Sequence, residues 1–138
     1  MQPPPAAARP LSVLVVDDDA DTATGLTELL GLYGFSARAA YSGREALAAA
    51  ESEPPDLVLL DLRMPRMTGW ELAKALNALP EPPVLVAVSG VGGAAALERS
   101  ASAGIRLHLV KPVDPPTLVD ILRVIGKAAT PRECVGAA

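Results

Sequence analysis

The sequence predicts a doubly wound α/β domain, in which five parallel strands alternate with five helices. Five short runs rich in Val, Leu and Ala recur at intervals of twenty-odd residues, and apolar residues at helical spacing follow each run. Half of the residues are hydrophobic, yet only four are aromatic: one Trp, two Tyr and one Phe. A core of aliphatic side chains is typical of a parallel sheet that helices cover on both faces.

The first strand is predicted at Val13–Val16, directly before the acidic triplet Asp17–Asp19. The helix that follows ends at Gly34, because a glycine readily stops a helix. Its apolar positions are Leu26, Leu29, Leu30 and Tyr33. A short second strand is predicted over residues 36–40.

Ser42 and Glu45 have the spacing of a capping box, which predicts a second helix ending before Pro54. The run Leu57–Leu60 fits a strand buried on both faces. A third helix follows and ends at Pro80, because proline cannot continue it. The apolar stripe of this helix is Trp70, Leu72, Ala73, Leu76 and Leu79.

The rest of the chain predicts two more strands and two more helices. Strand Val84–Val88 precedes an Ala-rich helix that ends near Gly104, and the last strand is Leu107–Val110. Asp114 is expected to cap the final helix, with Pro115 in the first turn, where its missing N–H does no harm. The inward positions predicted for this helix are Leu118, Ile121, Leu122 and Ile125.

Composition limits the kind of protein. The net charge is -4 and no run of Lys or Arg exists, which argues against a nucleic-acid surface. No apolar run approaches a membrane span, the opening residues lack the basic start and apolar centre typical of a signal peptide, and the single Cys134 cannot pair within the chain. We therefore expect a cytoplasmic, soluble domain over residues 11–127, with a Pro/Ala-rich leader at 1–10 and a loose tail at 128–138.

Polar side chains stand where four of the predicted strands end. Asp61 follows the buried run Leu57–Leu60, Asp17 and Asp18 follow the first strand, Ser89 ends the fourth, and Lys111 follows the fifth. A buried, unpaired carboxylate is costly, so Asp61 needs a partner or an open site. In open parallel sheets, ligands bind outside the carboxyl ends of the strands, where these groups fall.

Two or three neighbouring carboxylates repel one another unless a cation lies among them. Oxygen ligands favour Mg²⁺, which commonly binds carboxylates together with phosphate. Lys111 and Ser89 suit phosphoryl oxygens, and no nucleotide-binding Gly-rich loop with Lys is present. The set predicts phosphoryl transfer, with one acid left to act as a nucleophile that forms an acyl phosphate.

Four motifs in this order resemble the receiver domain of bacterial two-component response regulators. They are Val15-Val-Asp17-Asp18-Asp19, Leu59-Leu-Asp61-Leu-Arg-Met-Pro65-Arg-Met-Thr-Gly69, Val88-Ser89-Gly90 and Val110-Lys111-Pro112. The resemblance covers about residues 11–127. It implies a flavodoxin-like sheet of strand order 2-1-3-4-5. It also implies a signalling phosphoacceptor rather than an enzyme, beyond autophosphorylation from small donors and autodephosphorylation.

The resemblance assigns a role to each site residue. Asp61 accepts a phosphoryl group from a histidine kinase or a histidine phosphotransfer protein. Mg²⁺ binds Asp17, Asp18, Asp61 and the backbone carbonyl of Arg63, while Ser89 and Lys111 contact the phosphoryl group. The output is binding to a downstream protein, by a monomer or weak dimer.

Two departures from the family pattern carry further expectations. His108 stands where many receivers have Tyr or Phe, and we expect it to act with Ser89 as the switch. Gly90, Gly92 and Gly93 loosen the segment before the fourth helix, so the face of the fourth helix, fifth strand and fifth helix should move. Arg63 and Val91 are the positions expected to tune the lifetime of the phosphoryl group.

Other interpretations compete with this one. Asp17–Asp19 also fits the nucleophile motif of haloacid-dehalogenase-like phosphatases, with Asp17 as nucleophile, but Asp61 would then have no role. A receiver-like binding module that is never phosphorylated is a second alternative, although the acid and lysine set is complete. Asp19 is interpreted as a helix cap or surface acid. Trp70, Met64 and Met67 are interpreted as packing residues at the mouth of the site.

Overall fold

A computed structural model of the protein describes residues 9–129. Most of the predicted leader, most of the predicted tail and Cys134 lie outside the described residues. Arg9, which the sequence places in the leader, pairs with Asp56 at 3.5 Å. The last helix continues to Ala129, two residues past the domain boundary predicted at 127.

Five strands and five helices alternate along the chain, as predicted. The strands are β1 (Ser12–Val16), β2 (Ser36–Ala40), β3 (Leu57–Leu60), β4 (Val84–Ser89) and β5 (Leu107–Val110). The helices are α1 (Ala20–Leu32), α2 (Gly43–Ser52), α3 (Gly69–Asn77), α4 (Ala94–Ser102) and α5 (Pro115–Ala129). The strands form one sheet in the order β2-β1-β3-β4-β5, and every adjacent pair is parallel. This confirms the predicted strand order.

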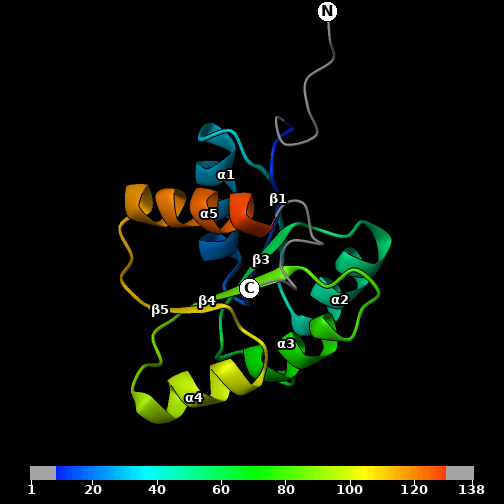
Figure 1. Ribbon diagram of the computed structural model, residues 1–138, viewed down its shortest axis with the longest axis vertical. Helices are drawn as coiled ribbons and strands as arrows, with labels where there is room; N and C mark the ends of the chain where they lie inside the picture. The colour runs from blue at the N-terminus through cyan, green and yellow to red at the C-terminus, as the bar shows by residue number, and fades with distance from the viewer. Residues whose placement is uncertain (1–8, 130–138) are drawn as a thin grey trace, which may run out of the picture.

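Helices cover both faces of the sheet. Figure 1 shows α1 and α5 together on one side, and α2, α3 and α4 on the other. Alternate residues of β1 and β3 point to opposite faces: Val13 and Leu57 belong to the α1/α5 core, whereas Leu14 and Val58 belong to the other core. Each fully buried aliphatic side chain contributes about 1.5–3 kcal/mol through the hydrophobic effect.

The final helix presents a slightly different face from the predicted one. Leu118 and Leu122 are buried as predicted, and Val119 is buried as well, at 1% exposure. Ile121 was predicted to face inward, but it is only half-buried. The prediction was wrong here because the helix sits with Val119 turned toward the sheet, which rotates Ile121 to the border of the buried face.

The helix ends set the loops that surround the site. Asp19 caps α1 by accepting from the N–H groups of Asp21 and Thr22, as one of its two interpretations predicted. Ser42 caps α2, but the Glu45 carboxylate accepts from the N–H of Tyr41 rather than from Ser42, so the predicted capping box is only half formed. In contrast, the N-cap residue of α4 is Gly93, which has a φ of 98° and offers no side-chain cap.

A complete capping box forms at α3, where the sequence analysis had not placed one. The Thr68 hydroxyl accepts from the N–H of Glu71, and the Glu71 carboxylate accepts from the N–H of Thr68. The Thr-x-x-Glu spacing is visible in the sequence. This cap fixes the helix that follows the loop from Asp61.

No helix within residues 9–129 combines the length and the apolarity needed to cross a lipid bilayer.

Candidate functional site

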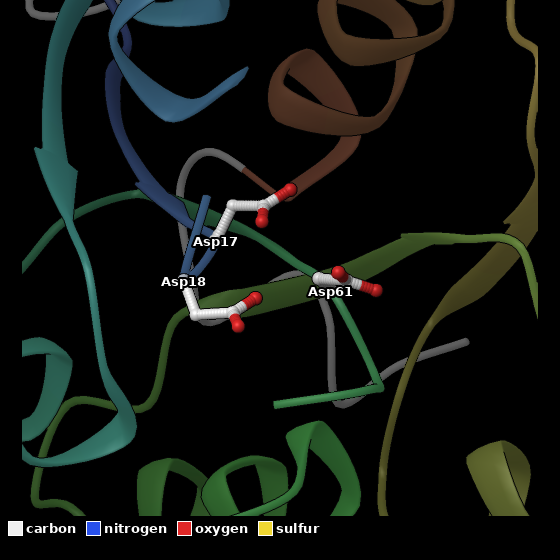
Figure 2. A group of neighbouring side chains, drawn as sticks. All are labelled: Asp17, Asp18 and Asp61. Atoms are coloured by element: carbon white, nitrogen blue, oxygen red, sulfur yellow. The ribbon is translucent and has the colours of Figure 1, made fainter. Parts of the chain in front are cut away.

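The polar residues that follow four strands meet at one edge of the sheet. Because β1, β3, β4 and β5 are neighbours and parallel, their carboxyl ends lie side by side. Figure 2 shows Asp17 and Asp18 after β1 next to Asp61 after β3. One carboxylate oxygen from each of these three residues lies within 4.8 Å of the others. The predicted convergence of the three acids is therefore present.

Asp17 is the most buried acid of the cluster, at 6% exposure. Its Oδ1 accepts from the N–H of Asp19 at 2.9 Å, and its Oδ2 lies 3.6 Å from Lys111 Nζ. Burial raises the pKa of the Asp17 carboxyl; the N–H of Asp19 opposes this shift, and the negative charge of Asp61 adds to it. Lys111 also lowers this pKa, but the net direction is upward, so the ionised cluster is electrostatically unfavourable on its own.

The backbone around Asp61 is held from both sides. The N–H of Asp61 donates to the carbonyl of Val16 at 3.0 Å, and the N–H of Arg63 points at Asp61 Oδ1 at 3.4 Å. The N–H of Gly69 donates to the carbonyl of Leu62 at 3.0 Å, which closes the loop. A Cβ atom at Gly69 would lie 2.3 Å from the Asp61 carbonyl oxygen, so only glycine permits this close approach.

Ser89 and Lys111 are joined through the backbone. The Lys111 N–H donates to the Ser89 carbonyl at 2.9 Å, which ties the end of β4 to the end of β5. The Ser89 side chain is fully buried, and its Oγ accepts from the N–H of Val91 at 3.3 Å. The Lys111–Pro112 peptide bond is cis. Because Ser89 Oγ acts as the acceptor in its bond with Val91, the hydroxyl proton of Ser89 is available for an oxygen of a bound group.

A small cavity lies among these side chains. It is lined by Asp17, Asp61 and Lys111 together with apolar residues that include Val88 and Leu26, and it has a volume of about 30 Å³. That space is enough for one ion or one water molecule. Its charged lining consists of two carboxylates and one ammonium group, which suits a hard cation together with an anionic oxygen.

The three residues interpreted as packing at the mouth of the site behave differently from one another. Met64 is buried, and Met67 is half-buried with its sulfur against Gly43, where a Cβ atom would lie 2.5 Å from Sδ. Trp70 packs against the core, but its indole N–H also donates to Ser100 Oγ at 3.0 Å. The sequence analysis missed this polar role because nothing local links α3 to α4.

His108 makes two hydrogen bonds. Its Nδ1 lies 2.8 Å from Ser100 Oγ, and its Nε2 lies 2.7 Å from the carbonyl oxygen of Val91. Sequence reasoning did not find Ser100; the available signal was a serine four residues after Ala96, on the buried side of α4. His108, expected to act in the switch, is thus hydrogen-bonded to Val91, expected to tune the lifetime of the phosphoryl group.

Residues 13–123 match the family of response regulator receiver domains. The chain belongs to this family. This receiver domain is 30% identical over 111 residues to sporulation initiation phosphotransferase F of Bacillus subtilis, covering 80% of this chain and 90% of the relative. It is 38% identical over 113 residues to transcriptional regulatory protein ZraR of Salmonella typhimurium, covering 81% of this chain but only 25% of that relative. The chain thus spans about a quarter of the length of ZraR.

Solved structures agree with the family. The receiver domain superposes on the chemotaxis response regulator CheY4 of Vibrio cholerae with a TM-score of 0.78 at 29% identity, covering 84% of this chain and 98% of the other. It superposes on a CheY-like receiver of Methylobacillus flagellatus with a TM-score of 0.73 at 36% identity, with the same coverage. The predicted family and fold are confirmed, and the chain is a receiver domain of two-component signalling rather than a typical enzyme. The matches give no support to the phosphatase or binding-module alternatives.

Proposed function

We propose that Asp61 is the phosphoacceptor of this receiver domain. The observation that carries the proposal is the meeting of three carboxylates within 4.8 Å, with Lys111 Nζ 3.6 Å from one of them. Asp61 is the member of the cluster that is half-buried, without an ion pair at 4.0 Å or less among the described residues. One oxygen of its carboxylate can therefore act as the nucleophile, while its other oxygen and the carboxylates of Asp17 and Asp18 serve a cation.

The donor set fits Mg²⁺. Asp17, Asp18 and Asp61 offer carboxylate oxygens, and the backbone carbonyl of Arg63 is proposed as a further ligand. When bound, Mg²⁺ supplies positive charge that offsets the repulsion among the carboxylates and the incoming phosphoryl group. The pKa of Asp17 is raised chiefly by burial, and the negative charges of Asp61 and Asp18 add to the shift, so a cation bound at this carboxylate would offset both effects.

The transfer step follows from these positions. One oxygen of the ionised Asp61 forms a bond to the phosphorus atom of the donor, and the bond from phosphorus to the donor's leaving atom breaks. The leaving group keeps the electron pair and takes a proton from solvent. The Ser89 hydroxyl donates to a phosphoryl oxygen, and the Lys111 ammonium shifts from Asp17 toward another. The product is an acyl phosphate on Asp61.

The donor proposed is a histidine kinase or a histidine phosphotransfer protein, acting in the cytoplasm. The similarity to sporulation initiation phosphotransferase F supports a phosphorelay role. The phosphorylated domain is proposed to bind a downstream protein through the face of α4, β5 and α5, as a monomer or weak dimer. Ser89 and His108 would carry the switch, while Arg63 and Val91 would set how long the phosphoryl group survives. No role in binding nucleic acid is proposed for this domain.

The test is phosphorylation from acetyl phosphate or phosphoramidate, read by intact mass. One added phosphoryl group that requires Mg²⁺ is expected for the wild-type protein and for Asp120→Asn, which removes an exposed acid on α5. Asp61→Asn should show no adduct. An adduct that survives Asp61→Asn but not Asp17→Asn would instead favour the phosphatase chemistry, and no adduct on the wild type would favour the binding module.

A further inference from the structure

A chain of hydrogen bonds joins three elements behind the site. The indole N–H of Trp70 on α3 donates to Ser100 Oγ on α4 at 3.0 Å. Ser100 Oγ lies 2.8 Å from Nδ1 of His108 on β5, and His108 Nε2 lies 2.7 Å from the carbonyl oxygen of Val91, in the loop between β4 and α4. The three bonds join pairs of residues that are separated in the sequence by 30, 8 and 17 positions, respectively.

The two ends of this line each have a fixed hydrogen-bonding role. An indole N–H can only donate, and a backbone carbonyl can only accept. Ser100 accepts from Trp70, so its own hydroxyl proton is available to His108 Nδ1. The Val91 carbonyl requires a proton on His108 Nε2. A neutral imidazole has a single proton, so with that proton on Nε2 its Nδ1 accepts, and the Ser100 hydroxyl is the donor to it.

The middle of the line is shielded from solvent. Ser100 is 1% exposed, and a buried hydroxyl is much more costly without a partner than with one. The Arg99 guanidinium lies 4.1 Å from the centre of the Trp70 ring, which holds the indole from the outer side. Among the described residues, no buried side-chain nitrogen or oxygen lacks a partner, so the bonding scheme is complete.

Val91 is the point at which this line reaches the site. Its carbonyl accepts from His108, and its N–H donates to Ser89 Oγ at 3.3 Å. Within residues 9–129, the side chains of Ser89 and His108 are the only ones found hydrogen-bonded to the loop at 90–93. The loop ends at Gly93, the N-cap residue of α4, which offers no side-chain cap. The hydrogen bonds from Ser89 and His108 are therefore the side-chain hydrogen bonds that hold this loop among the described residues.

We propose that Trp70, Ser100 and His108 act as a positioning relay, which fixes Val91 and through it the Ser89 hydroxyl, and does so only while the proton of His108 is on Nε2. None of the three relay residues touches the reacting atoms. The relay sets where the loop stands, and the loop sets how the Ser89 oxygen is held. The position of the Ser89 hydroxyl should in turn affect phosphoryl uptake, and this consequence rests on the proposed function of Asp61.

The tautomer of His108 is the first test, because the relay requires one fixed tautomer, whereas a histidine without fixed partners exchanges its proton between the two nitrogens. The protein has a single histidine, so its imidazole ¹⁵N signals need no further assignment. At a pH of about 8, where an ordinary imidazole is neutral, we expect a protonated Nε2 and an unprotonated Nδ1. A proton on Nδ1, or signals averaged between the two forms, would overturn the relay.

Amide hydrogen exchange tests whether the relay holds the loop. Ser100→Ala and His108→Phe should raise the exchange rate of the Val91 N–H about fivefold or more, the factor expected for losing one hydrogen bond. The matched control is Ser102→Ala, an exposed serine on the same helix. If Ser100→Ala leaves the Val91 amide as protected as Ser102→Ala does, the relay does not position the loop.

Phosphorylation from acetyl phosphate then tests the link to Ser89. Ser100→Ala should slow the uptake by about the same factor as the exchange rises, and Ser102→Ala should leave it unchanged. Equal uptake rates for the two variants would refute the link to Ser89. If the wild-type protein takes up no phosphoryl group, the assignment of Asp61 fails, while the ¹⁵N and exchange measurements still decide the relay.

Discussion

Gly69→Ala places a methyl group where the backbone of the site leaves no room. The added Cβ would lie 2.3 Å from the carbonyl oxygen of Asp61, 2.7 Å from Leu62 Cα and 2.9 Å from a methyl of Leu60. Two of these atoms belong to the backbone, so rotation of a side chain cannot relieve the contact. Either α3 moves outward or the Asp61 peptide moves inward, and the hydrogen bond from the Gly69 N–H to Leu62 lengthens.

The expected cost is that of overpacking a closely packed interior, about 1–3 kcal/mol. Alanine at the first position of α3 recovers less than ~1 kcal/mol through helix propensity, so the net change is destabilising. With a urea m-value of about 1–3 kcal/mol/M, the midpoint of unfolding should fall by roughly 1 M while m itself stays constant. Phosphorylation of Asp61 should also slow, because the acceptor is displaced.

Gly90→Ala is the matched control. Gly90 also lies in a loop of the site, yet no atom lies within 4 Å of a Cβ built there. Alanine there should leave stability unchanged or raise it by about 0.4–1 kcal/mol, through the unfolded chain. Equal urea midpoints for the two variants would refute the argument that the Gly69 approach positions Asp61.

Three further outcomes are expected. Gly25→Ala, in the interior of α1 with no atom within 4 Å of the new methyl, should stabilise the fold by about 0.5–1 kcal/mol in urea unfolding, and a loss of stability would contradict it. Asp17→Asn in EDTA should be more stable than the wild type at pH 7. Because the pKa of Asp17 is raised in the fold, the wild type loses stability as pH rises through the folded pKa, so this gap should close on acidification; a gap that widens at low pH would be inconsistent. Mg²⁺ at a hundredfold excess over its Kd should raise the free energy of unfolding of the wild type by about 2.7 kcal/mol, and by much less in Asp18→Asn; equal effects would exclude Asp18 as a ligand.

Much of the fold was predictable because the signals are local. The apolar runs of β1 and β3 and the stop at Gly34 report the burial and backbone freedom of those residues themselves. The same holds for the helix caps. Asp19 was predicted as a possible cap, and the spacing of Thr68 and Glu71 is also a local signal, of a capping box. In contrast, the strand order came from the resemblance of four motifs, since the strands alone do not say which of them pair.

The sequence by itself determined that acids, a hydroxyl and a lysine would stand at the ends of strands. It also predicted that these groups would meet, because parallel strands separated by helices bring their carboxyl ends to one edge of the sheet. Only the tertiary structure decided the contacts between distant segments. The bond from Trp70 to Ser100 and the bond from His108 to Val91 depend on how α3, α4 and β5 pack, not on neighbours along the chain. The face that α5 turns to the sheet is decided in the same way: the apolar pattern allowed Ile121 inside, and packing against the sheet placed Val119 there.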